Sequence, residues 1–138
     1  MTVVIDASLA LGWIFERAEP REAAEADAVL ASLEHRRGLV PALWHVEVLN
    51  ALVVAHRRGV IAVAKALDFI SSLERLPIET DVAVLPRKEH ILSLAREYEL
   101  SAYDSAYLDL ALRADAPLAT FDARLSRARD RIGLPSFS

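Results

Sequence analysis

The sequence contains no cysteine. This absence excludes disulfide bonds, a thiolate metal site and a cysteine nucleophile, and it fits a reducing, cytoplasmic setting. Long uncharged apolar runs are also missing, since the most apolar stretch, Leu39 to Ala55, carries Glu47 in its middle. A membrane span needs about 20 apolar residues, so we expect none, and the N-terminus shows no basic segment typical of a signal peptide.

Lysine is nearly absent. Lys65 and Lys88 are the only lysines among 16 basic residues, and 20 acidic residues leave a formal net charge of −4. This balance is not that of a protein that coats nucleic acid through its overall charge. Hydrophobic residues make up 54% of the 138 residues, which excludes general disorder and supplies one sizeable core. We therefore expect a single domain over residues 1–138.

Short apolar strands alternate with helices along the chain. The pattern predicts strands at 3–5, 38–41, within 77–85 and at 117–121. It predicts helices at about 9–15, 20–37, 43–58, 62–75, 88–98, 102–114 and 122–131. This alternation indicates a three-layer α/β/α fold with a short, mainly parallel central sheet.

Three aspartates lie at strand ends or helix starts. Asp6 and Asp122 each follow a predicted strand directly, and Asp104 lies in the first turn of a helix. Ligands of such sheets bind beyond the carboxyl ends of the strands. Each residue also has a structural interpretation, because Asp6 and Asp122 suit helix N-caps, and Ser101 with Asp104 fits a capping box.

Glu47 lies within the apolar face of the helix at 43–58, next to Leu43, Trp44 and Ala51. A buried carboxylate is costly unless it is paired, protonated or bound to metal, and Arg96 or Arg113 is a possible partner. Four acids at one crevice repel one another unless a cation lies among them. Oxygen ligands alone favour Mg²⁺ or Mn²⁺ over zinc.

Four sequence blocks resemble those of the PIN-domain family, and most of all those of the VapC ribonuclease toxins of bacterial toxin–antitoxin pairs. They cover nearly the whole chain in the family's order and are Val3–Ser8, Trp44–Leu52, Ser101–Leu108 and Leu118–Asp122. The resemblance implies a five-stranded parallel sheet, hydrolysis of single-stranded or looped RNA, and a cognate antitoxin.

The resemblance also implies a set of site residues. The four acids that would bind Mg²⁺, or Mn²⁺ in its place, are Asp6, Glu47, Asp104 and Asp122. Auxiliary polar groups are expected at Ser8, Asn50 and Thr120.

Asp109 is turned away from Asp104, and we expect it at the surface.

Arginines cluster directly after Asp122, at Arg124, Arg127, Arg129 and Arg131. They form either a solvated helix face or a cradle for RNA phosphates, for which Arg124 and Arg127 are the candidates. The alanine-rich helices at 22–33 and 62–73 are more apolar than a lone core needs. They either pack or frame a groove for an antitoxin helix, and exposed apolar faces predict a homodimer.

Two other functions fit parts of the pattern. A catalytically silent PIN module would bind RNA or protein with the same fold, and the intact set of four acids argues against it. A receiver-like signalling domain also clusters aspartates, but it needs a late lysine, and the last lysine here is Lys88. The sequence therefore predicts a metal-dependent endoribonuclease.

Overall fold

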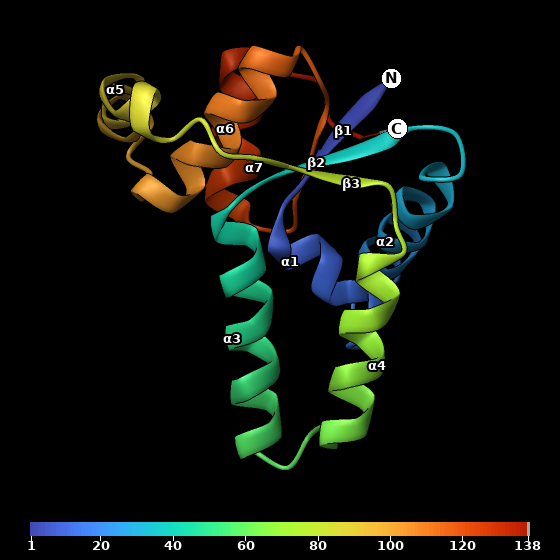
Figure 1. Cartoon of the computed structure of the whole chain (residues 1–138). Coiled ribbons are helices and arrows are strands. Elements are labelled where there is room, and N and C mark those ends of the chain that lie inside the picture. Colours follow the sequence, from blue (N-terminus) through green and yellow to red (C-terminus); the bar gives the residue numbers. More distant parts are fainter. Residues whose placement is uncertain (138) are drawn as a thin grey trace.

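Four parallel strands form one sheet in the computed structural model, which describes residues 1–137. The spatial order is β3-β2-β1-β4 (Figure 1). The strands are β1 (Thr2–Ile5), β2 (Arg37–Pro41), β3 (Ile78–Asp81) and β4 (Leu118–Ala119). Val4 pairs with Leu39 on one side and with Leu118 on the other, so β1 is central.

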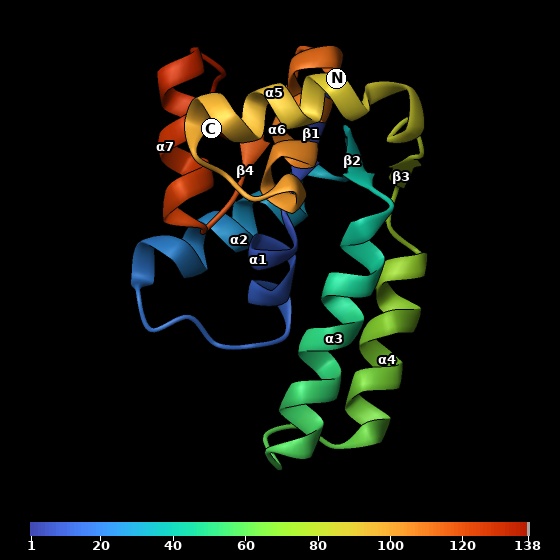
Figure 2. The same ribbon diagram turned by 90° about the vertical axis from the view of Figure 1, so that its left-hand side faces the viewer.

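Helices cover both faces of this sheet, which confirms the predicted α/β/α fold. Figures 1 and 2 show α6 against one face with α5 and α7 beside it, and α1 and α2 on the other side. The helices are α1 (Ala7–Ala10), α2 (Pro20–Ser32), α3 (Leu43–Arg57), α4 (Val63–Glu74), α5 (Lys88–Tyr98), α6 (Ala102–Ala114) and α7 (Ala123–Ile132). Single 3₁₀ turns lie at Leu11–Trp13 and Leu85–Arg87.

The central strand β1 is apolar on both faces because helices cover both. Val3, Val4 and Ile5 have no exposed surface, as expected of a parallel strand between two helical layers. Gly38 of β2 lies so close to Ile5 that a Cβ there would meet the Ile5 side chain at 2.9 Å. The order of the sheet reverses at β1, between β2 and β4, and crevices of α/β folds form at this kind of reversal.

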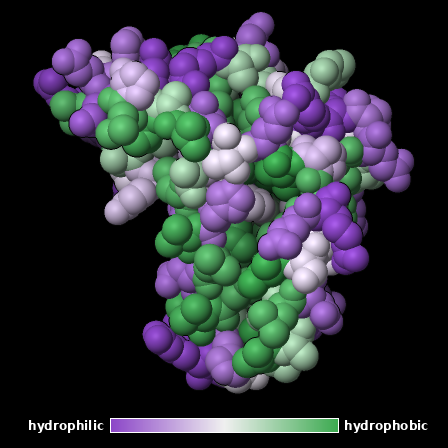
Figure 3. All heavy atoms as spheres, in the orientation of Figure 1, coloured by the Kyte–Doolittle hydropathy of each residue, from purple (hydrophilic) through white to green (hydrophobic). Residues whose placement is uncertain are grey.

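Helices α3 and α4 form a hairpin that extends away from the sheet (Figures 1 and 2). Gly59 turns the chain between them with a φ of 71°. Every residue of α4 is exposed or half-buried. Figure 3 shows apolar side chains spread over this hairpin, which agrees with the exposure of Leu49, Val53 and Leu67.

Strand β4 is shorter than the predicted strand at 117–121. Beyond Ala119 the backbone N–H groups bond to side-chain hydroxyls and not to a neighbouring strand. Phe121 N donates to Ser8 Oγ, and Asp122 N donates to Thr120 Oγ1. The family resemblance implies five strands, whereas the structure has four within residues 1–137. A single parallel bridge between Leu118 and Ser136 lies where a fifth strand would pair.

The helix predicted at 20–37 ends earlier, at Ser32. Residues 33–36 form turns instead, and the last predicted residue, Arg37, begins β2, where its N–H donates to Met1 O. The helices at 88–98 and 102–114 have the predicted bounds. Among the described residues, no helix has both the length and the apolar character that a membrane span needs.

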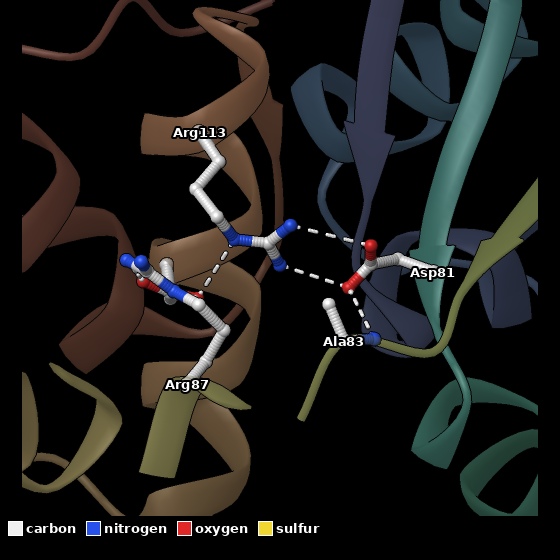
Figure 4. Close-up of polar contacts among 5 residues, drawn as sticks. Asp81, Ala83, Arg87 and Arg113 are labelled. Atoms are coloured by element: carbon white, nitrogen blue, oxygen red, sulfur yellow. Dashed lines mark hydrogen bonds and ion pairs between the residues drawn. The ribbon is translucent and has the colours of Figure 1, made fainter. Parts of the chain in front are cut away.

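Asp109 is buried, so its predicted place at the surface is wrong. Its carboxylate accepts hydrogen bonds from Arg87 at 2.7 and 3.2 Å and from Arg113 at 3.0 Å. Arg113 continues to Asp81 at the end of β3 with two further bonds (Figure 4). Burial alone raises the pKa of Asp109, but these arginines outweigh it and hold the pKa below its ordinary value.

Candidate active site

The four predicted site acids lie at the carboxyl end of the sheet and affect one another's charge. Asp6 follows β1, Asp122 lies three residues after β4, Asp104 is in the first turn of α6, and Glu47 is on α3. Asp122 and Asp6 both raise the pKa of Asp104, and Asp6 and Asp104 both raise that of Glu47. The fold therefore brings these four carboxylates from four elements into one cluster.

Asp6 is almost completely buried, with 5% of its surface exposed. Ser8 Oγ and Thr120 Oγ1 each donate to its Oδ2 at 2.6 Å. Burial raises the pKa of Asp6, as does the charge of Asp122. Hydrogen bonds from Ser8, Thr120 and the Ala7 backbone lower it by less. Asp6 occupies the N-cap position of α1 without a side-chain cap bond among the described residues, so the capping interpretation fails here.

Glu47 is half-buried, and its partner is a tyrosine rather than an arginine. Tyr107 Oη donates to Glu47 Oε1 at 2.6 Å. Burial raises the pKa of Glu47 most, the Tyr107 bond lowers it, and the charges of Asp6 and Asp104 raise it further. Arg113, one of the two partners considered, instead binds Asp81 and Asp109.

Asp104 and Asp122 each take part in the capping of a helix and also belong to the acid cluster. The Asp104 backbone N–H donates to Ser101 Oγ at 3.0 Å, so Ser101 caps α6 as expected. Burial, helped by the charges of Asp122 and Asp6, raises the pKa of Asp104 to about 6. Asp122 caps α7, because its Oδ1 accepts from Leu125 N at 2.9 Å. The prediction that Asp122 is an N-cap is therefore correct. Asp122 still acts on the other acids through its charge.

The sequence profile of the PIN domain matches residues 3–131. The chain belongs to the PIN domain family. This confirms the resemblance stated from the sequence blocks, and the PIN domain is a nuclease fold.

Two crystal structures resemble this PIN domain. PAE2754 from Pyrobaculum aerophilum has a TM-score of 0.67 and 23% identity, over 93% of this chain and 79% of that one. FitAcB from Neisseria gonorrhoeae has a TM-score of 0.64 and 18% identity, over 99% of this chain and 96% of that one. At these identities the likeness establishes the fold alone. No curated protein matches the chain significantly.

The donor set of this PIN domain suits a hard divalent cation. Its members are four carboxylates, and burial and mutual repulsion raise the pKa of three of them, a cost that a cation would relieve. Among residues 1–137, no three acidic or histidine side chains already stand in position to hold one ion.

The predicted auxiliary residues separate into two groups. Ser8 and Thr120 lie inside the cluster, and their hydroxyls are 3.3 Å apart. Asn50 lies one helical turn after Glu47 with an exposed side chain. Its role stays a prediction.

The arginine cluster does not act as one surface. Arg124 is exposed, and its charge lowers the pKa of Asp104, so it lies near this acid. Arg127 is exposed on the same helix. Arg129 is buried and donates to the Leu118 carbonyl at 3.1 Å, and Arg131 lies over the ring of Tyr98. Arg124 is thus the member of the cluster best placed to meet a ligand of the acids.

Sequence reasoning missed Tyr107, whose hydroxyl holds Glu47. The residue lies in the apolar stripe of α6, where a tyrosine ring is ordinary core. The available signal was Glu47 itself, because a carboxylate on an apolar face needs a donor and Tyr107 offers one from a facing helix.

We expect the metal-free protein to lose stability as the pH rises from about 4 to about 6, and Asp104→Asn to reduce this loss by the part that Asp104 contributes. The folded chain holds the Asp104 proton with a pKa of about 6, whereas an unfolded aspartate has a pKa of about 3.9. The stabilising contribution is thus present below pH 4 and is lost as the pH rises through the folded pKa. Thermal melts in EDTA measure this dependence.

In those melts, Asp104→Asn should unfold at a higher temperature than wild type near pH 7.5, with a difference that shrinks toward pH 4.5. A variant that melts below wild type at pH 7.5 would show that Asp104 stabilises the fold instead.

Proposed function

We propose that this PIN domain is a metal-dependent endoribonuclease that hydrolyses RNA phosphodiester bonds. The observation that carries the proposal is the charge coupling among Asp6, Glu47, Asp104 and Asp122 at the reversal point of the sheet. A set of like charges that serves only the fold is costly, and a divalent cation is the ligand that offsets it.

The four acids would hold Mg²⁺ or Mn²⁺. When bound, the ion supplies the acidity that makes water nucleophilic near neutral pH and offsets the charge of the phosphodiester. Ser8 and Thr120 favour the ionised form of Asp6 against the effect of its burial, since both donate to its Oδ2, and they leave Oδ1 without a hydroxyl donor. Tyr107 likewise donates to one oxygen of Glu47.

Arg124 is the proposed contact for an RNA phosphate beside the acids. Its guanidinium provides a planar set of donors suited to phosphate oxygens, and it acts on the charge of Asp104. Arg127 lies three residues further along α7 and would extend this contact along the RNA backbone.

The purified chain should cleave a mixed RNA substrate with Mg²⁺ or Mn²⁺ and stop when EDTA is added. Asp6→Asn, Glu47→Gln and Asp104→Asn should each lower the rate by more than about 100-fold, beyond the 10- to 100-fold loss typical of residues that only orient a ligand. Gel assays of cleavage with time measure these rates.

Asp68→Asn is the matched control, because Asp68 is an exposed acid on α4 and should keep wild-type activity. Equal activity in the Asp104→Asn protein would contradict the site. A wild-type protein that binds RNA but never cleaves it would favour the silent PIN module.

We further propose that the enzyme is the toxin of a toxin–antitoxin pair. The sequence blocks that resemble VapC toxins support this, and so does an apolar groove between α3 and α4. The groove has two cavities of about 270 and 240 Å³, lined among others by Leu49, Val53, Leu67 and Ile70. Its walls fit the apolar face of an antitoxin helix. The sequence predicted α2 and α4 as the walls; α3 faces α4 in this groove. The homodimer stays a prediction.

The antitoxin proposal is tested by coexpression with the product of the neighbouring small reading frame. That product should copurify with wild type, fail to copurify with Leu67→Glu, and stay bound to Leu92→Glu, which alters an equally exposed leucine on α5. Loss of the partner from both variants, or no such neighbouring gene, would contradict the toxin assignment.

A further inference from the structure

We propose that Tyr107 is a positioning residue that fixes the Glu47 carboxylate within the acid cluster through its hydroxyl. The inference rests on the metal site proposed above and assigns one side chain outside the four acids to it. Tyr107 has no exposed surface, and its hydroxyl joins two other elements. It accepts from Ala7 N at 3.3 Å and donates to Glu47 Oε1 at 2.6 Å.

The direction of these two bonds is determined by chemistry. A backbone N–H can only donate, so the Tyr107 oxygen is the acceptor for Ala7. The single hydroxyl proton is then directed toward Glu47, whose Oε1 must accept it. Tyr107 therefore fixes the direction in which Glu47 Oε1 accepts, and with it the orientation of the Glu47 carboxylate.

The same arrangement occurs twice more in the cluster. Phe121 N donates to Ser8 Oγ, which donates to Asp6 Oδ2. Asp122 N donates to Thr120 Oγ1, which donates to the same Asp6 oxygen. In all three cases a backbone N–H orients a hydroxyl, and the hydroxyl orients one carboxylate oxygen. Tyr107 thus does for Glu47 what Ser8 and Thr120 do for Asp6.

Tyr107 also explains how Glu47 is held relative to Asp6. Glu47 is on α3, whose hairpin extends away from the sheet, whereas Asp6 is at the end of the buried strand β1. The Tyr107 hydroxyl connects Glu47 to the backbone of Ala7, the residue directly after Asp6. Without it, the Glu47 side chain keeps its helix but loses its tie to the first acid.

Tyr107→Phe removes this hydroxyl and keeps the buried ring. The experiment titrates Mn²⁺ against the melting temperature of the full chain, starting from EDTA. The Mn²⁺ concentration for half of the stabilisation should rise about 10- to 100-fold in Tyr107→Phe, as for other residues that orient metal ligands. Tyr98→Phe is the control and should match wild type, since its ring contact with Arg131 survives the change.

The same Mn²⁺ titration is repeated in the Glu47→Ala protein, with and without Tyr107→Phe. If Tyr107 acts through Glu47, Tyr107→Phe should weaken Mn²⁺ binding no further in that background. The same loss with and without Glu47 would overturn the proposal, and so would wild-type affinity in Tyr107→Phe or its failure to fold in EDTA. A wild-type protein that Mn²⁺ does not stabilise would instead overturn the proposed metal site itself.

Discussion

Repulsion among four carboxylates is the interaction around which the site of this PIN domain is arranged. Asp6, Glu47, Asp104 and Asp122 come from four different elements, and burial together with the neighbouring charges disfavours the ionised forms of the first three. The chain offsets part of this cost with hydroxyl donors, each of which is oriented by a backbone N–H. What remains uncompensated is negative charge, and that charge is the basis of the proposed cation site.

The parallel sheet determines where the charge of Asp6 lies. Because β1 is central and buried on both faces, the residue after it emerges at the reversal point between β2 and β4. The short β4 ends early so that Thr120 and Phe121 can bond to side chains of the cluster rather than to a neighbouring strand. Asp109 shows the opposite case, a buried carboxylate whose charge is compensated. It forms ion pairs with two arginines, Arg87 and Arg113.

Local patterns predicted much of the fold. The bounds of α5 and α6 follow from residues that end helices, and the sheet from short apolar strands between helices. The start of β2 and the end of β4 depend on partners distant in sequence, Met1 for one and Ser8 for the other, so no local window contains them. Asp109 was misplaced because one of its arginines, Arg87, lies 22 residues before it outside α6, although the other, Arg113, lies one turn later on the same helix.

The four acids themselves were predicted from strand ends, one helix start and one glutamate on an apolar helix face, together with the family resemblance. The groups that orient them were visible only in part. Ser8 and Thr120 stood beside motif acids, whereas Tyr107 lay in a stripe that any core helix would show. Its role depends on a hydrogen bond across 60 residues of sequence, which spacing does not reveal.

The most direct test of the account is a crystal of the protein soaked in Mn²⁺ and measured at a wavelength where manganese scatters anomalously. The account predicts an anomalous peak beyond the carboxyl ends of β1 and β4, in contact with at least three of Asp6, Glu47, Asp104 and Asp122. A fully soaked crystal with no peak there, or with manganese bound only at other acids, would contradict it.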